Sequence, residues 1–247
     1  MRRGCGPAEA VGVQTLTPVR VTATLAGEVE PRTRPARTRT RWTSVLVAVV
    51  VGLVLGPLDL LLQRVLPHPF ADLANSPALW ALVAFCVGWS DRVRGRWWPA
   101  AAGTLTLILA VEGYHATAVL ALGDDPSTLT NGAAVLWLGA ALVAGVVFGT
   151  AGSWAGSARK WLGPIGTATA VGVLLAEAWL DLARLAGAGD DPARSQDLVQ
   201  TALVLLVLAS VAAVLAGRSA RQRVVGSVLA LPLALLEALA FGSIGLL

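Results

Sequence analysis

The chain has 247 residues, of which 55% are hydrophobic and only 14% are charged, and its mean hydropathy is +0.69. Soluble domains are about one quarter charged, so this composition excludes an ordinary soluble fold and predicts a multi-pass membrane protein. The formal net charge of +4 is compatible with nucleic acid binding, but the basic residues lie before and between apolar segments, so we expect no nucleic acid partner.

Residues 1–42 are expected to form a disordered, Arg-rich cytoplasmic tail. Eight of the nineteen Lys and Arg residues lie within the first 41 positions, and the segment "PRTRPARTRTR" lacks the aromatic residues and apolar periodicity of a folded element. The tail either binds anionic lipid or orients the protein in the membrane, and we favour the orientation signal.

The remainder, 43–247, is predicted to have an all-α fold, a polytopic bundle of seven transmembrane helices. A helix needs about 20 largely apolar residues to cross a hydrocarbon core about 30 Å thick, and clusters of Arg, Asp and Pro separate seven such segments. The second segment is the shortest. The predicted spans are 43–66, 75–90, 98–122, 130–155, 161–186, 195–216 and 224–247.

The basic residues predict the orientation of this bundle in the lipid bilayer. If the tail is cytoplasmic, 16 of the 19 Lys and Arg residues lie on the inner side, and only Arg64, Arg184 and Arg194 lie on the outer side. Because inner loops are enriched in Lys and Arg, we expect a cytoplasmic N-terminus and an extracytoplasmic C-terminus in a bacterial cell membrane. The predicted inner ends also have the tryptophans of an interfacial belt: Trp42, Trp97, Trp98, Trp154 and Trp161.

Short local patterns predict helix contacts and one helix start. Glycines four residues apart at 52–56 and 145–149 predict close packing of the first and fourth spans against neighbouring helices. Asn75 and Ser76 are good N-cap residues for the second span. His68, in the preceding outer loop, is expected to be solvated.

Acidic residues lie within the odd-numbered spans, and four of them lie in one layer roughly 10 to 15 Å below the outer surface, at about 1.5 Å per residue. An ionised carboxyl facing lipid near the bilayer centre costs about 2.5 to 3.5 kcal/mol, so we expect these side chains to face the bundle interior. Arg184 is expected to compensate Asp181, three residues before it. The predicted site consists of Asp59 in the first span, Glu112 and His115 in the third, Glu177 and Asp181 in the fifth, and Glu237 in the seventh.

Two functions are compatible with this acidic layer. In the leading hypothesis the protein binds or transports a small solute or cation at the six predicted site residues, and a change of protonation at Glu112 and His115 acts as a switch. In the alternative the protein is a membrane scaffold or accessory subunit, and its acids only form hydrogen bonds between helices.

Motifs for metal binding or catalysis are incomplete. Glu112 and His115 have the Glu-x-x-His spacing of carboxylate-bridged di-metal bundles, but that architecture requires two such motifs. The two cysteines, Cys5 in the tail and Cys86 in a span, are not placed to meet as a disulfide or a thiolate metal site. No phosphate-binding loop, zinc-protease motif or nucleophile elbow occurs. We therefore expect no metal, no cofactor and no enzymatic activity.

Three apolar segments are similar to a known family: "LANSPALWALVAFCVG" at 73–88, "VLWLGAALVAGVVFGTAG" at 135–152 and "LLAEAWL" at 174–180. Through them the chain resembles a family of multi-pass membrane proteins from high-GC Gram-positive bacteria that is catalogued as a domain of unknown function. The resemblance covers about 43 to the end of the chain and leaves out the tail. It implies a membrane bundle and brings no activity, ligand or catalytic residue.

Overall fold

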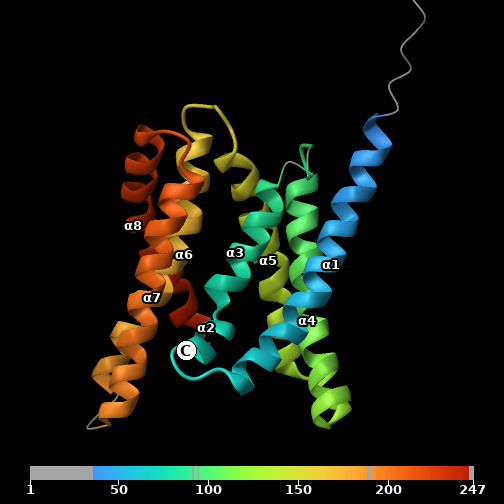
Figure 1. The fold of residues 1–247 in the computed structure, drawn as a ribbon, viewed down its shortest axis with the longest axis vertical. Coiled ribbons are helices and arrows are strands. Elements are labelled where there is room, and N and C mark those ends of the chain that lie inside the picture. Colours follow the sequence, from blue (N-terminus) through green and yellow to red (C-terminus); the bar gives the residue numbers. More distant parts are fainter. Residues whose placement is uncertain (1–35, 91, 94, 188–190, 245–247) are drawn as a thin grey trace, which may run out of the picture. The chain divides into compact units, whose positions relative to one another are not determined.

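The structure is a computed structural model that describes residues 36–90, 92–93, 95–187 and 191–244. Within these ranges the chain is all-α, with eight α-helices, two short 3-10 helices and no strand (Figure 1). The helices are α1 (Ala36–Val65), α2 (Phe70–Ala74), α3 (Pro77–Trp89), α4 (Trp98–Leu122), η1 (Pro126–Leu129), α5 (Gly132–Ala155), α6 (Leu162–Arg184), η2 (Leu185–Gly187), α7 (Pro192–Ala216) and α8 (Ala220–Ile244).

Six of the described helices, α1, α4, α5, α6, α7 and α8, are long and apolar enough to cross a membrane. They correspond to six of the seven predicted spans. The second predicted span, 75–90, contains only the 13-residue helix α3, which at about 1.5 Å per residue is too short to cross about 30 Å of hydrocarbon by itself.

Two segments predicted to lack regular structure contain helix. Helix α1 begins at Ala36, within the predicted tail, because Ala and Arg are good helix formers and extend the helix before Trp42. The expected disorder of 1–35 lies outside the described residues. The predicted outer loop contains α2, whose five residues are too few to produce a recognisable apolar period.

Helices α1 and α4 run parallel and pack through glycine. The backbone at Gly52 faces Thr106, and the backbone at Gly56 faces Ala110, so the contact advances in the same direction along both helices. A Cβ at either glycine would overlap these backbone carbonyl oxygens. The Thr106 hydroxyl also donates to the Ala48 carbonyl at 3.3 Å. The close packing predicted from the first glycine pair is therefore confirmed.

The second glycine pair is also confirmed as a contact. In α5, a Cβ at Gly145 would overlap the backbone of Thr104 in α4, and a Cβ at Gly149 would overlap the carbonyl of Pro99. Gly88 of α3 lies against Gly149 in the same way. These contacts bring α3, α4 and α5 together at backbone distance, as small residues do in membrane helices.

The segment α2–α3 returns the chain along α1. Because α1 and α4 are parallel neighbours, the chain between them has to run back over their length. Near the end of α1, Gln63 Nε2 donates to Asn75 Oδ1 at 3.4 Å, and near its beginning Ser44 Oγ donates to the Arg92 carbonyl at 2.9 Å. Residues 75–92 therefore cover most of the length of α1, with a helix break at their start.

Helix α6 is the most buried of the long helices. In its most apolar stretch of 18 residues, 67% of the residues are buried, against 22% to 33% in the corresponding stretches of the other five long helices. It packs in parallel with α8, since Gly163 faces Gln222 and Gly226 faces Thr167. Gln222 Nε2 ties this contact by donating to the Thr167 hydroxyl at 3.0 Å. Polar groups in the middle of α6 are consequently enclosed by neighbouring helices.

The replacement Gly56→Ala is expected to lower the free energy of unfolding by about 1 to 3 kcal/mol, because the added methyl group displaces α4 from α1. Thermal unfolding of the purified protein in detergent measures this. Gly139→Ala in α5 is the matched control, since nothing lies within 4 Å of the added Cβ, and it should be neutral or slightly stabilising. Equal stability of the two variants would contradict the described α1–α4 contact.

Candidate functional site

The break between α2 and α3 starts a helix within the bundle. Ser76 is the N-cap of α3, and its Oγ accepts a hydrogen bond from the Leu79 amide at 3.1 Å, as its position in the sequence predicted. Pro77 occupies the first helical position, where its lack of an N–H group leaves one fewer donor to satisfy. Ser76 is buried, with 1% of its surface exposed, so water does not satisfy the remaining donors of this turn.

Glu177 of α6 completes this cap from another helix. Its Oε2 accepts from the Ser76 hydroxyl at 2.9 Å and from the Ala78 amide at 2.7 Å. A carboxyl at a helix N-terminus also interacts favourably with the helix dipole. Glu177 faces inward, as predicted, and its role is the capping of α3.

Two cavities adjoin at the break, and both are lined by Asn75, Pro77, Trp137 and Val173. The first, here named the aromatic cavity, has a volume of about 320 Å³ and is also lined by Asp59, Trp80, Tyr114, His115, Phe148 and Glu237. The second, the acidic cavity, has a volume of about 410 Å³ and is also lined by His68, Asp72, Glu177, Asp181, Arg184, Arg194 and Asp197.

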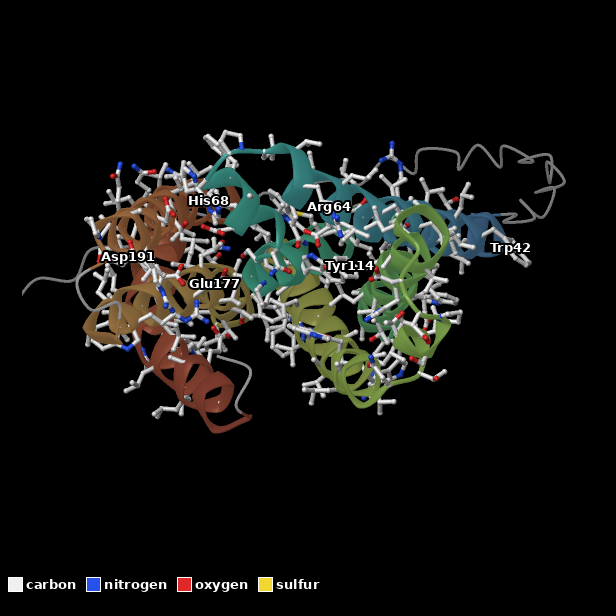
Figure 2. All side chains as sticks on the ribbon, turned by 90° about the horizontal axis from the view of Figure 1, so that it is seen from below. Trp42, Arg64, His68, Tyr114, Glu177 and Asp191 are labelled. Atoms are coloured by element: carbon white, nitrogen blue, oxygen red, sulfur yellow. The ribbon has the colours of Figure 1, made fainter. Side chains whose placement is uncertain are left out.

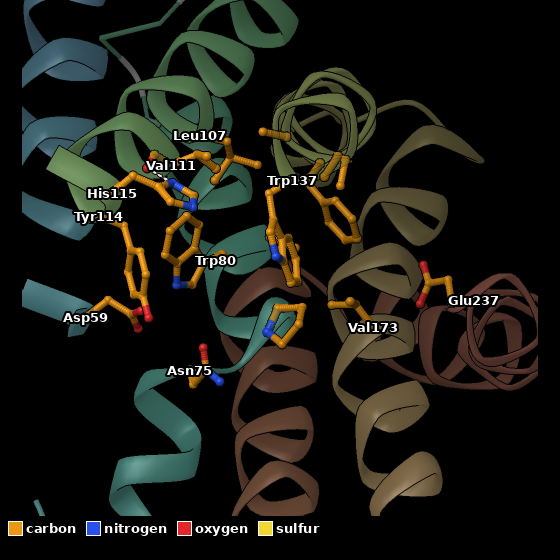
Figure 3. Close-up of a pocket in the computed structure, with 16 residues that line it drawn as sticks. Asp59, Asn75, Trp80, Leu107, Val111, Tyr114, His115, Trp137, Val173 and Glu237 are labelled. Carbon is orange, nitrogen blue, oxygen red and sulfur yellow. Dashed lines mark hydrogen bonds between the residues drawn. The ribbon is translucent and has the colours of Figure 1, made fainter. Parts of the chain in front are cut away.

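One end of the aromatic cavity is a polar corner around Asp59. The Asp59 carboxyl is 4% exposed, and its Oδ2 accepts from Gln63 Nε2 at 2.8 Å. Trp80 and Tyr114 pack edge to face with ring centroids 6.4 Å apart. Figure 3 shows both rings beside Asp59. Figure 2 shows Tyr114 and Glu177 among the helices, whereas Trp42 lies at their edge.

His115 follows Tyr114 on α4, and the centroids of the two rings are 5.6 Å apart. Its Nδ1 lies 2.9 Å from the Val111 carbonyl, drawn as a dashed line in Figure 3. Because a carbonyl oxygen can only accept, Nδ1 holds the proton in this hydrogen bond. In the neutral imidazole Nε2 is then an acceptor on a side chain that lines the cavity. His115 is therefore a site residue, as predicted.

Glu237 of α8 lies at the other side of the aromatic cavity (Figure 3). Its carboxyl lies over Gly172 of α6, where the glycine leaves room for it. The Oε2 atom is buried and has no hydrogen-bond partner in the described part of the chain. An unsatisfied carboxyl oxygen in a protein interior is unfavourable, so this end of the cavity lacks a donor.

Asp181, another predicted site residue, lines the acidic cavity together with Arg184. Arg184 Nη1 donates to Asp181 Oδ1 at 2.8 Å, which confirms the predicted compensation. At the edge, in the loop before α2, His68 Nδ1 lies 2.9 Å from Asp72 Oδ2. The hydrogen bond to Asp72, and second its negative charge, raise the pKa of His68 above the usual histidine value. His68 is exposed, as expected.

The expectation that Glu112 faces the interior is wrong. Its side chain is exposed on α4 and lines neither cavity, whereas its neighbour Val111 is 4% exposed. His115 bonds to the Val111 carbonyl rather than to Glu112. The reason is rotational: α4 is enclosed only where it meets α1, α3 and α5, and Glu112 lies on the uncovered arc.

Sequence reasoning missed the aromatic walls of the site. Trp80 is the fourth residue of α3 and Trp137 is the sixth residue of α5, so both lie near helix ends, where interfacial tryptophans are usually placed. Their positions in the sequence therefore gave no signal for a role in the cavity wall. The capping of Ser76 by Glu177 had no local signal, because the two residues are 101 positions apart.

The family model described as "Family of unknown function (DUF6518)" matches residues 35–246, which is most of the chain. The matched region includes every residue of both cavities and begins close to the start of α1. No curated protein and no solved structure matches the chain.

Removal of the Glu177 carboxyl should destabilise the protein. Glu177→Ala leaves the Ser76 hydroxyl and the Ala78 amide without their acceptor, and we expect a loss of about 1 to 3 kcal/mol for each group. Glu177→Gln retains an accepting oxygen and should lose less. Thermal unfolding in detergent compares them with Glu112→Ala, the exposed glutamate on α4, whose replacement should not lower the stability. A Glu177→Ala protein as stable as Glu112→Ala would contradict the capping role.

Proposed function

The chain belongs to the family of unknown function DUF6518, and on that premise we propose that it is an integral membrane protein that binds or transports a small solute or cation. The observation that supports this most is the pair of adjoining cavities, which bring five of the six predicted residues to their walls. We propose binding rather than catalysis because the sequence has no phosphate-binding loop, zinc-protease motif or nucleophile elbow. A cofactor or metal is not part of the proposal.

The proposal includes the predicted topology, with seven crossings, the N-terminus in the cytoplasm and the C-terminus outside a bacterial cell membrane. In it, α2 and α3 together make the second crossing as a discontinuous helix. The parallel arrangement of α1 and α4 supports this, since an odd number of crossings has to separate parallel neighbours from each other. The cavities then lie in the outer half of the bundle, and an origin in high-GC Gram-positive bacteria stays a prediction.

Topology is tested with single cysteines in a background of Cys5→Ser and Cys86→Ser. Ser127→Cys, between α4 and α5, should react in intact cells with a membrane-impermeant maleimide, because three crossings place it outside. Ala158→Cys, between α5 and α6, should react only after permeabilisation. If α3 does not cross, the two positions exchange sides, and the opposite labelling pattern would disprove the seven-crossing arrangement.

Solute binding requires a cavity that the outer solution can reach. Ala140→Cys on the cavity face of α5 should react in intact cells with trimethylammonium-ethyl methanethiosulfonate, because the aromatic cavity adjoins the acidic cavity at Asn75, which is exposed. Val143→Cys, three residues on and 63% exposed, should not react, because its side chain faces lipid. Absence of labelling at Ala140→Cys would leave a dry bundle and remove the support for solute binding.

A scaffold or accessory subunit is the second candidate, and the exposed Glu112 favours it. A carboxyl facing lipid near the bilayer centre costs about 2.5 to 3.5 kcal/mol, and a partner helix with a hydrogen-bond donor would remove that cost. Under this alternative the replacement Asp59→Asn affects only stability in detergent, and Ala140→Cys stays unlabelled. In the solute-binding proposal, the protonation switch predicted at Glu112 and His115 is limited to His115, because only His115 lines a cavity.

A further inference from the structure

The aromatic cavity has walls suited to an organic molecule. Trp80, Tyr114, His115, Trp137 and Phe148 line it from α3, α4 and α5. Its volume of about 320 Å³ falls in the range of small-molecule sites, which are mostly apolar with a few polar groups that orient the ligand. A hydrated inorganic ion would gain little from so many ring surfaces, so the walls favour a ligand with an apolar body.

The charged groups on these walls are all carboxyls. Asp59 lies at one side and Glu237 at the other (Figure 3), and no Lys or Arg lines the cavity. Among the described residues, neither carboxyl takes part in an ion pair. An anionic ligand would therefore meet two acids without a counter-charge, and a neutral apolar ligand would leave Asp59 without a counter-charge.

The groups around Asp59 fit the head of a cation. Trp80 and Tyr114 lie beside Asp59, and a cation within about 6 Å of such a ring is attracted by its negative face. Among the described residues no group of three or more His, Cys, Asp or Glu side chains is arranged to hold a metal ion, so this corner is not built for a bare metal.

The acidic cavity, which adjoins the aromatic cavity, also favours cations. Four carboxyls line it, those of Asp72, Glu177, Asp181 and Asp197, against the two guanidinium groups of Arg184 and Arg194 and the exposed imidazole of His68. A cleft lined by one excess sign of charge raises the local concentration of ions of the opposite sign. The acidic cavity thus favours the approach of cations to the walls that it shares with the aromatic cavity.

We propose that the aromatic cavity binds a monovalent organic cation, an amine or quaternary ammonium with an apolar body, and that its positive group lies against Asp59 beside Trp80 and Tyr114. The apolar body extends past Trp137 toward Val173, where both cavities share their walls. This inference rests on the proposed function and names the class of solute that the site takes.

Benzyltrimethylammonium is the probe, and its binding to the purified full chain in a non-ionic detergent is followed by thermal unfolding and by quenching of tryptophan fluorescence. Three compounds separate charge from shape: neopentylbenzene has the same shape without charge, benzenesulfonate has the opposite charge, and tetramethylammonium has the charge without the ring. We expect a saturable rise in melting temperature with benzyltrimethylammonium and at least about tenfold weaker binding of each of the other three.

Variants locate the site. Asp59→Asn should weaken binding of benzyltrimethylammonium about tenfold or more, because a buried counter-charge is lost, and Trp80→Leu should weaken it several-fold. Glu112→Gln, which removes a carboxyl outside both cavities, should leave the affinity unchanged. If Asp59→Asn does not fold, Trp80→Leu and Glu237→Gln replace it. Unchanged affinity in folded Asp59→Asn, or in both replacement variants, would overturn the proposed placement.

The outcomes also separate this inference from the proposed function. Binding of neopentylbenzene or benzenesulfonate in place of the cation would disprove the solute class and leave a solute-binding protein. If no compound binds but Ala140→Cys is labelled from outside, only the inference of an organic cation is disproved. No binding together with an unlabelled Ala140→Cys would remove both proposals.

Discussion

The hydrogen bonds from Ser76 and Ala78 to Glu177 are the interaction on which the site depends. A helix that starts away from water needs acceptors for its first N–H groups, and a carboxyl buried between helices needs donors. The buried helix start and the buried carboxyl would each be unfavourable alone, but here each supplies the hydrogen-bond partner that the other needs. The break in α2–α3 can therefore exist only where α6 presents Glu177, and the two cavities meet at that break.

The glycine contacts hold the elements that surround this interaction. Gly52 and Gly56 bring α1 to backbone distance from α4, which sets Asp59, one turn further along α1, beside Tyr114. Because α1 and α4 are parallel, α2–α3 has to return between their ends, and the return places Ser76 at the level of Glu177. Close packing on one side of the break thus leaves space at the break itself, where Asn75 and Pro77 line both cavities.

Helix positions were predictable because local chemistry ends most helices. For α4 the predicted bounds 98–122 match the structure, with Pro99 in the first turn and Gly123 at φ 76°, a left-handed conformation that glycine adopts readily. The short helix α2 and the discontinuity after it were not predictable in the same way. Their geometry depends on Glu177, about a hundred positions away, and a window of sequence contains no information about that distance.

The depth of the acids could be counted from the sequence, but their direction could not. Glu112 and Glu177 both follow apolar residues in helices of similar length, and each lies inside its helix at a similar depth. The difference is that α6 is enclosed by neighbours, while α4 leaves one arc uncovered. Hydrophobic periodicity shows an inward face only when the opposite face is polar, and in a bilayer both faces are apolar.

The acids also differ in how their charge is satisfied, and this difference points to function. Glu177 is held by helix donors and Asp181 by Arg184, so the structure itself answers their need for partners. Within the described part of the chain, Asp59 has an amide donor but no positive partner, and the Oε2 atom of Glu237 has no donor. Both line the aromatic cavity. The charge that balances this cavity therefore has to come from a proton or from a bound cation, and the aromatic rings between the two acids favour a cation with an apolar body.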